Sequence, residues 1–201
     1  MEELQTELYK GHRIRILTDD DPLNPRTECD GQAGTMVCSH RRYDLGDAHD
    51  VKFDDHESWD EAEAWIIKEH KAIVILPIYM YDHSGITIRT TPFSCPWDSG
   101  RLGLIYTTTN MAKDVLGVPR NKKLTIENLK KVRKLLEAEV VEYDKYIRGE
   151  AYRFEVYHEA DEEHDNLIDA CSGYDDIDAA TTDAKHFVDA HVKQAKVGTC
   201  L

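Results

Sequence analysis

Two polar strings, residues 81–85 and 92–100, contain the side-chain types that nucleophilic catalysis requires. A thiol or hydroxyl becomes a nucleophile when an imidazole takes its proton and a carboxylate orients that imidazole. Neither string has the Gly-x-Ser-x-Gly turn of a hydrolase or a known cysteine-protease context, so a structural loop around Trp97 remains an alternative. The candidate catalytic residues are His40, Asp82, His83, Cys95 and Asp98, with Ser99 as a second possible nucleophile.

Histidine and carboxylate side chains also suggest a divalent metal, since they suit Zn²⁺, Mn²⁺ or Fe²⁺. The candidate ligands are His40, Asp47 and His83, with His49 and Asp82 nearby in the sequence. The spacing gives this hypothesis little support. Cys29-x8-Cys38-x-His40 is no usual zinc pattern, and His158-Glu159 is separated from His164 by more residues than the zinc-protease motif allows. We therefore expect no cofactor, with a divalent metal as the alternative.

The charge of the chain is unevenly distributed, and its net value is −14. Residues 155–184 contain eleven acids and no Lys or Arg, and residues 44–63 contain nine acids against Lys52. Residues 101–150 are net basic, and the exposed face expected for a long helix there includes Lys130, Lys131, Arg133 and Lys134. An acidic protein is a poor direct binder of nucleic acid, because phosphates need cations.

Rows of carboxylates can instead imitate nucleic-acid phosphates and occupy a basic groove on another protein. The candidate binding residues are Asp161, Glu162, Glu163, Asp165, Asp175 and Asp176. The expected partner is then a protein with a basic surface. The alternative is an ordinary solvated face that keeps the protein in solution.

Four strings carry a resemblance to a known family: residues 21–26, 34–47, 81–87 and 92–100. They include Gly-Thr-Met-Val-Cys-x-His-Arg-Arg-Tyr-x-Leu-Gly-Asp, Tyr-Asp-His-Ser-Gly-Ile-Thr and Pro-Phe-Ser-Cys-Pro-Trp-Asp-Ser-Gly. These strings resemble signatures of a family of small phage- and plasmid-borne proteins, over about residues 14–157. The resemblance implies a mobile-element setting and no particular activity.

The elements that must position these strings follow from hydrophobic periodicity. Alternation predicts strands at 12–17, 85–90, 103–108 and 151–157, the last strand of the chain, while the apolar stretches 35–38 and 72–81 predict two more. The strand at 85–90 should pair with the preceding strand, 72–81, as a hairpin. Helices are expected at 59–70 after a Ser58/Glu61 capping box, from an Asn110 cap to Gly117, at 126–148 after Thr125, and at 177–196. Pro77 raises the possibility of a bulge or an edge in the strand 72–81.

The resulting fold class is α/β or α+β, with a mostly antiparallel sheet of four to five strands and three or four helices packed on it. We expect a single domain, 1–201, in which residues 158–201 form a possible acidic appendage. The longest apolar run is about half of what a membrane-spanning helix needs, and the acidic N-terminus is unlike a signal peptide, so we expect a cytoplasmic protein with free thiols.

Two functions compete. The first is a phage or plasmid accessory protein that inhibits a host defence complex or nuclease, and the second is a small enzyme that uses the Asp/His/Cys cluster. A structural or regulatory role is a third possibility. The enzyme or ligand-binding interpretation gains strength if loops 24–47, 81–85 and 92–100 close into one pocket.

Overall fold

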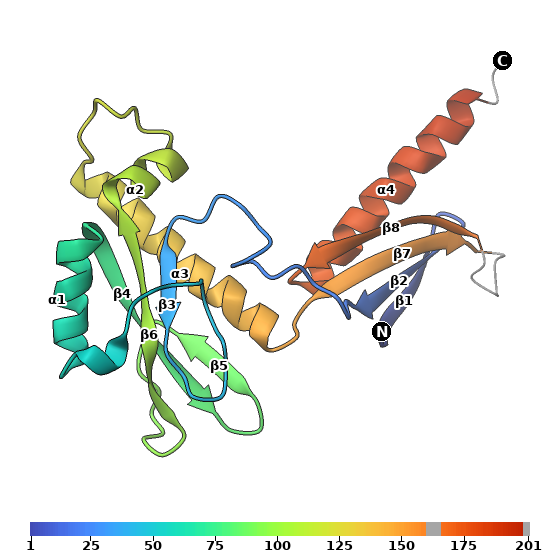
Figure 1. The fold of residues 1–201 in the computed structure, drawn as a ribbon. Coiled ribbons are helices and arrows are strands. Elements are labelled where there is room, and N and C mark those ends of the chain that lie inside the picture. The colour runs from blue at the N-terminus through green and yellow to red at the C-terminus, as the bar shows by residue number, and fades with distance from the viewer. Residues whose placement is uncertain (160–165, 199–201) are drawn as a thin grey trace. The chain divides into compact units, whose positions relative to one another are not determined.

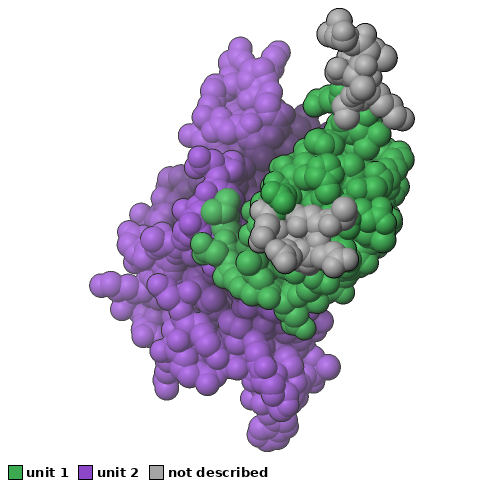
Figure 2. Space-filling model, turned by 90° about the vertical axis from the view of Figure 1, so that its right-hand side faces the viewer, with its two compact units in different colours: residues 1–23, 149–201 green, residues 24–148 purple. Residues whose placement is uncertain are grey.

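The strands of the protein form two separate four-stranded antiparallel sheets in the computed structural model, which describes residues 1–159 and 166–198 (Figure 1). Each sheet belongs to one of two compact units: unit 1 comprises residues 1–23 and 149–201, and unit 2 comprises residues 24–148 (Figure 2). The antiparallel α+β class is therefore confirmed. The sequence analysis expected a single sheet and did not anticipate this division into units.

Unit 1 has the strand order β1-β2-β7-β8, formed by β1 (Glu3–Tyr9), β2 (His12–Thr18), β7 (Tyr152–His158) and β8 (Leu167–Tyr174). A tight turn at Lys10 and Gly11, both with positive φ, joins β1 to β2. Helix α4 (Ile177–Gly198) packs on this sheet, where Ala180, Ala184 and Val188 meet the buried side chains of β2 and β7. Part of the segment considered as an appendage thus supplies a strand and a helix to this unit.

Unit 2 has the order β3-β6-β4-β5, formed by β3 (Thr35–Cys38), β4 (Ala72–Asp82), β5 (Ile86–Arg89) and β6 (Ser99–Thr108). Helix α3 (Ile126–Ile147) buries Val132, Leu136, Val140 and Tyr143 against one face of this sheet. The other face is covered by α1 (Trp59–Glu69), through Ile66, and by the segment before it, which contains the short helix η1 (Phe53–Asp55). Burial on both faces explains why β4 is apolar at nearly every position.

Pro77 fits within β4 because β5 pairs only with residues 79–82 of that strand, so one edge of β4 has no partner strand at Pro77. The predicted hairpin between β4 and β5 is confirmed. Helix α1 begins as expected after Ser58, whose hydroxyl accepts from the Glu61 N–H. The carboxylate of Glu61, however, accepts from the Glu57 N–H, so only half of the predicted capping box forms.

Three predictions about elements were wrong. Helix α2 (Thr109–Leu116) begins after Thr108, whose hydroxyl accepts from the Met111 N–H, and not after Asn110. The strand at 151–157 is not the last one, since β8 follows it, and β1 was missed altogether. Both missed strands are outer strands of their sheet, where polar residues replace the apolar alternation that marks a central strand. Among the described residues, no helix is long and apolar enough to span a bilayer.

Candidate functional site

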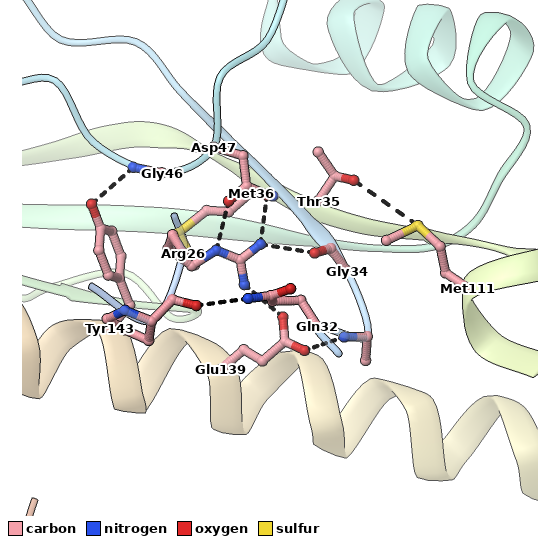
Figure 3. Close-up of polar contacts among 12 residues, drawn as sticks. Arg26, Gln32, Gly34, Thr35, Met36, Gly46, Asp47, Met111, Glu139 and Tyr143 are labelled. Atoms are coloured by element: carbon pink, nitrogen blue, oxygen red, sulfur yellow. Dashed lines mark hydrogen bonds and ion pairs between the residues drawn. The ribbon is translucent and has the colours of Figure 1, made fainter. Parts of the chain in front are cut away.

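The buried side chain of Arg26 organises the polar loop at residues 24–47 of unit 2 (Figure 3). The side chain of Arg26 is 2% exposed and donates to both carboxylate oxygens of Asp47, at 2.8 and 2.5 Å. It also donates to Glu139 on α3 and to the carbonyl of Gly34, both at 2.8 Å. The arginine therefore ties the loop at residue 26, the segment before β3 and helix α3 to one another.

The two carboxylates of this network also accept backbone N–H groups. Asp47 accepts from Met36 at 2.8 Å, and Glu139 accepts from Ala33. Burial raises the pKa of Glu139, against the opposing effect of the Ala33 N–H and of Arg26. Burial alone would lower the pKa of Arg26, but its bonds to Asp47 and Glu139 outweigh burial and raise that pKa. We call Arg26, Asp47 and Glu139 the Arg26 network, and every member has a structural task.

Three other residues in or just after the string at 34–47 also have structural roles: Cys38, Gly46 and His49. His49 Nε2 lies 2.8 Å from the carbonyl oxygen of Cys38. The Cys38 thiol is buried, and burial raises its pKa to about 12, so it stays protonated near neutral pH. Gly46 has a φ of 80°, and a Cβ there would lie 2.7 Å from the Met36 carbonyl oxygen. These residues therefore hold the chain close to β3.

A pocket lies at the end of the sheet where β4 finishes and β6 starts. It has a volume of about 390 Å³ and an apolar floor of Met80 and Leu102, which are 7% and 1% exposed. We call it the loop-end pocket; its remaining lining residues are His40, Arg42, Asp82, Trp97, Asp98, Ser99, Gly100 and Arg101. The loop after β3, the end of β4 and the loop before β6 therefore meet at one place, as the ligand-binding interpretation requires.

Antiparallel pairing places two of the polar strings side by side. Tyr81 of β4 is opposite Ser99 of β6, and the N–H of Asp82 donates to the carbonyl of Asp98 at 2.8 Å. Beyond the strand, the N–H of His83 donates to the carbonyl of Gly85 at 3.0 Å and closes the turn into β5. Strand pairing therefore fixes the backbone positions of Asp82 and Asp98 at this end of the sheet.

Asp98 lies between two of the candidate catalytic side chains. Its Oδ2 is 3.4 Å from His83 Nδ1 and 3.5 Å from the Sγ of Cys95. A catalytic triad needs the imidazole between thiol and carboxylate, whereas here the carboxylate is in the middle. In this arrangement Asp98 orients the His83 imidazole, whereas the Cys95 thiol contacts a carboxylate instead of the imidazole that would activate it. Ser99, the other possible nucleophile, donates to the carbonyl of Cys95.

The remaining side chains that line the pocket differ in their exposure and in the contacts that hold them in place. Arg42 pairs with Asp82, although the arginine side chain is 66% exposed. Arg101 pairs with Glu63 of α1 and lies over the ring of Trp59. His40 stacks on Tyr43, with ring centroids 4.9 Å apart. Trp97 is 91% exposed, which is far beyond what a core indole shows.

The predicted site residues therefore divide into two groups. His40, Asp82 and Asp98 line the loop-end pocket, and His83 and Cys95 contact Asp98. Asp47 belongs to the Arg26 network instead, which separates it in role from the other two proposed metal ligands, His40 and His83. No group of three or more metal-ligating side chains occurs in the described part of the chain, so the metal hypothesis gains no support.

Most of the predicted acidic binding residues cannot be placed. Asp161, Glu162, Glu163 and Asp165 lie outside the described residues. Asp175 and Asp176 are exposed in the connection between β8 and α4, and Asp176 accepts from the Ala179 N–H at 2.8 Å in the manner of a helix cap.

The sequence analysis did not assign three residues that matter here: Arg26, Arg42 and Trp97. Arg26 and Glu139 are 113 positions apart, and no local pattern pairs them. Trp97 was interpreted as holding a loop, whereas its exposure shows that it does not. For Arg42, the only available signal was its place in a polar string.

No protein-family model, curated protein or solved structure matches this chain. The resemblance to phage- and plasmid-borne proteins therefore stays a prediction.

Proposed function

We propose that unit 2 binds a small, neutral, hydroxyl-bearing ring compound, such as a nucleoside or a sugar, in the loop-end pocket. The observation that supports this most is the convergence of three polar strings around a concavity of about 390 Å³. That volume falls in the range of small-molecule sites, which combine an apolar surface with a few converging polar groups. The exposed indole of Trp97 and the small exposed part of Met80 supply that apolar surface.

The charges of the pocket favour a neutral ligand over an ionic one. Each guanidinium there has a carboxylate partner, Arg42 with Asp82 and Arg101 with Glu63. Paired groups of this kind offer hydrogen bonds to hydroxyls while contributing little net charge. Asp98 and Ser99 add acceptor oxygens at the same rim.

Trp97 supplies the flat apolar surface on which a ring can stack. Stacking of a base on an aromatic side chain is worth about 1–3 kcal/mol. An indole that is 91% exposed gains this energy only when something covers it. Loss of Trp97 should therefore reduce ligand affinity by about tenfold or more.

Calorimetric titration with a panel of nucleosides and mono- and disaccharides tests the proposal. The wild type should bind at least one compound, and Trp97→Ala should bind it at least tenfold more weakly. Ile126→Ala is the matched control, because Ile126 is an apolar residue of unit 2 that is 76% exposed and does not line the pocket. Absence of binding across the panel, or equal binding by Trp97→Ala, contradicts the proposal.

The enzymatic hypothesis is a proposal about the same pocket. The 3.4 Å contact between Asp98 and His83 Nδ1 supports it, because a carboxylate at one ring nitrogen leaves the other free to act as a base. For an identified ligand that is converted, His83→Ala should abolish turnover and leave binding intact. Turnover that survives this substitution would exclude His83 as the base.

A second candidate function is the inhibition of a host protein through an acidic surface. Seven exposed carboxylates of unit 2 form no ion pair within the described chain, and we call them the acidic strip: Asp44, Asp50, Asp54, Asp55, Glu57, Asp60 and Glu61. Unpaired charges of one sign attract an oppositely charged partner and accelerate association. In this proposal the protein is a cytoplasmic phage or plasmid accessory protein, and its partner is a defence complex or nuclease with a basic groove.

Pull-down from a host lysate tests this second function. A partner should be retained at low salt, released at high salt, and lost in the triple variant Asp54→Asn, Asp55→Asn, Glu57→Gln. The control carries Asp114→Asn and Glu127→Gln, which neutralise exposed acids outside the strip. Retention that ignores both salt and the triple variant argues against charge mimicry.

A further inference from the structure

The segment that connects α2 to α3 (Figure 1) and the first turns of α3 are strongly basic, although the protein as a whole is acidic. Residues 113–134 contain eight bases and two acids, whereas the whole chain has a net charge of −14. We call the exposed members the basic surface: Arg120, Lys122, Lys123, Lys130, Lys131, Arg133 and Lys134.

Most of these cations lack an acidic partner. Arg120 pairs with Asp114 at 2.7 Å, and Arg133 pairs with Glu137 at 3.3 Å. The other five are lysines, and none forms an ion pair with any residue that the structure describes. An anionic partner would therefore meet five ammonium groups that no carboxylate of the described residues neutralises.

The placement of these lysines costs stability in the free protein. Lys130 and Lys134 are four residues apart on α3, and like charges at this spacing repel. Bound carboxylates would relieve this repulsion.

An apolar hollow of about 410 Å³ lies within this surface. Ile73, Leu124 and Leu129 line it together with the cationic side chains of Lys113, Arg120, Lys122 and Lys123. Two hydrogen bonds tie the wall together: the buried Lys113 donates to the carbonyl of Arg120 at 2.7 Å, and the Lys122 N–H donates to the carbonyl of Pro119 at 2.9 Å. The hollow can therefore accept an apolar side chain without a large rearrangement.

We propose that the basic surface docks an acidic protein segment that inserts one apolar side chain, such as Leu or Phe, into this hollow. Charge complementarity identifies the carboxylates of the partner, and the apolar lining identifies its anchor. A nucleic acid fits less well, because no aromatic side chain lines the hollow for base stacking and its one arginine is already paired with Asp114.

This docking site is distinct from the loop-end pocket. Ala72 of β4 is opposite Thr108 of β6, and Tyr81 is opposite Ser99. Ile73 and Thr109 of the hollow therefore belong to one end of the strand pair, and Asp82 and Ser99 of the pocket belong to the other. The two proposals can fail independently.

The experiment is fluorescence anisotropy with a labelled twelve-residue peptide in which Asp and Glu surround a single Leu. The full chain should bind the peptide at low salt, and binding should weaken as salt rises. The variant Lys122→Gln, Lys123→Gln should bind about five- to tenfold more weakly, and so should the wild type with a peptide in which Ser replaces Leu. The matched control, Lys52→Gln with Lys68→Gln, should bind like the wild type because these exposed lysines lie elsewhere.

A melting curve for each variant separates lost docking from lost folding, and the Ser peptide tests the anchor without altering the protein. Three results would overturn the proposal. They are the absence of peptide binding at low salt, equal binding by the Lys122/Lys123 variant, and tighter competition by duplex DNA or by vesicles of phosphatidylglycerol than by the unlabelled peptide.

Discussion

Unit 2 contains arginine–carboxylate pairs in two different settings, one around a buried guanidinium and one around an exposed guanidinium. The Arg26 side chain is 2% exposed and donates to Asp47, Glu139 and the Gly34 carbonyl, whereas the Arg42 side chain is 66% exposed, pairs with Asp82 and lies 5.2 Å from the Tyr43 ring. A buried arginine that lost its carboxylates would be an uncompensated charge, so the Arg26 network holds loops in place. An exposed pair contributes little to stability, and its donors remain available to a ligand.

The largest effect is expected from Arg26→Met. Removing the guanidinium leaves the carboxylates of Asp47 and Glu139, which are only 19% and 15% exposed, without their partner, which costs about 3–5 kcal/mol. Urea unfolding followed by tryptophan fluorescence measures this loss. A loss below about 1 kcal/mol would mean that the network is not needed for folding.

Glu139→Gln should have the next largest effect, about 1–3 kcal/mol, because its single amide oxygen can accept from only one of the two donors, Arg26 or the Ala33 N–H, and leaves the other unsatisfied. It should also change the pH dependence of stability. Since burial raises the pKa of Glu139 in the folded state, the stability it contributes is complete below its unfolded pKa and is lost as pH rises through the folded pKa. Unfolding curves of the wild type should therefore show a decline in this window that the variant lacks, and equal declines would contradict the raised pKa.

Arg42→Met is the matched counterpart of the first substitution, and it should cost about 1 kcal/mol or less. The same unfolding measurement applies. A cost similar to that of Arg26→Met would remove the distinction between the two arginines.

Trp97→Ala should change the free energy of unfolding least, by about 0.5 kcal/mol or less, because almost the whole indole is in solvent. Its effect should instead appear in ligand binding. A large loss of stability would show that Trp97 is a packing residue and would remove the stacking surface from the proposed site.

Much of the fold followed from sequence patterns because burial leaves a local signature. The stripe on α3 and the apolar run of β4 each identified their element, and Thr125 and Gly117 marked helix ends. The strands β1 and β8 have no such signature, since outer strands keep much of their surface in solvent. The division into two units depends on the pairing of β2 with β7, which are far apart in the chain.

The candidate site was predictable only in part. Polar strings at strand ends indicated Asp82 and Asp98, and strand pairing then brought them together. The role of Asp47 was not predictable, because its partner Arg26 gives no signal of burial in the sequence. Arg42 is also an arginine, but its side chain is exposed. Residue type alone therefore does not distinguish an arginine that holds the fold from one that lines the pocket.

The most direct test of the distinction between the Arg26 network and the loop-end pocket is an NMR titration that follows amide and indole signals as a binding nucleoside or sugar is added. The Trp97 indole signal and the Ser99–Arg101 amide signals should shift, and the Nε signal of Arg26 should stay unchanged. Shifts that are strongest at Arg26 and Asp47, or that are absent from residues 97–101, would contradict the assignment of the loop-end pocket as the ligand site.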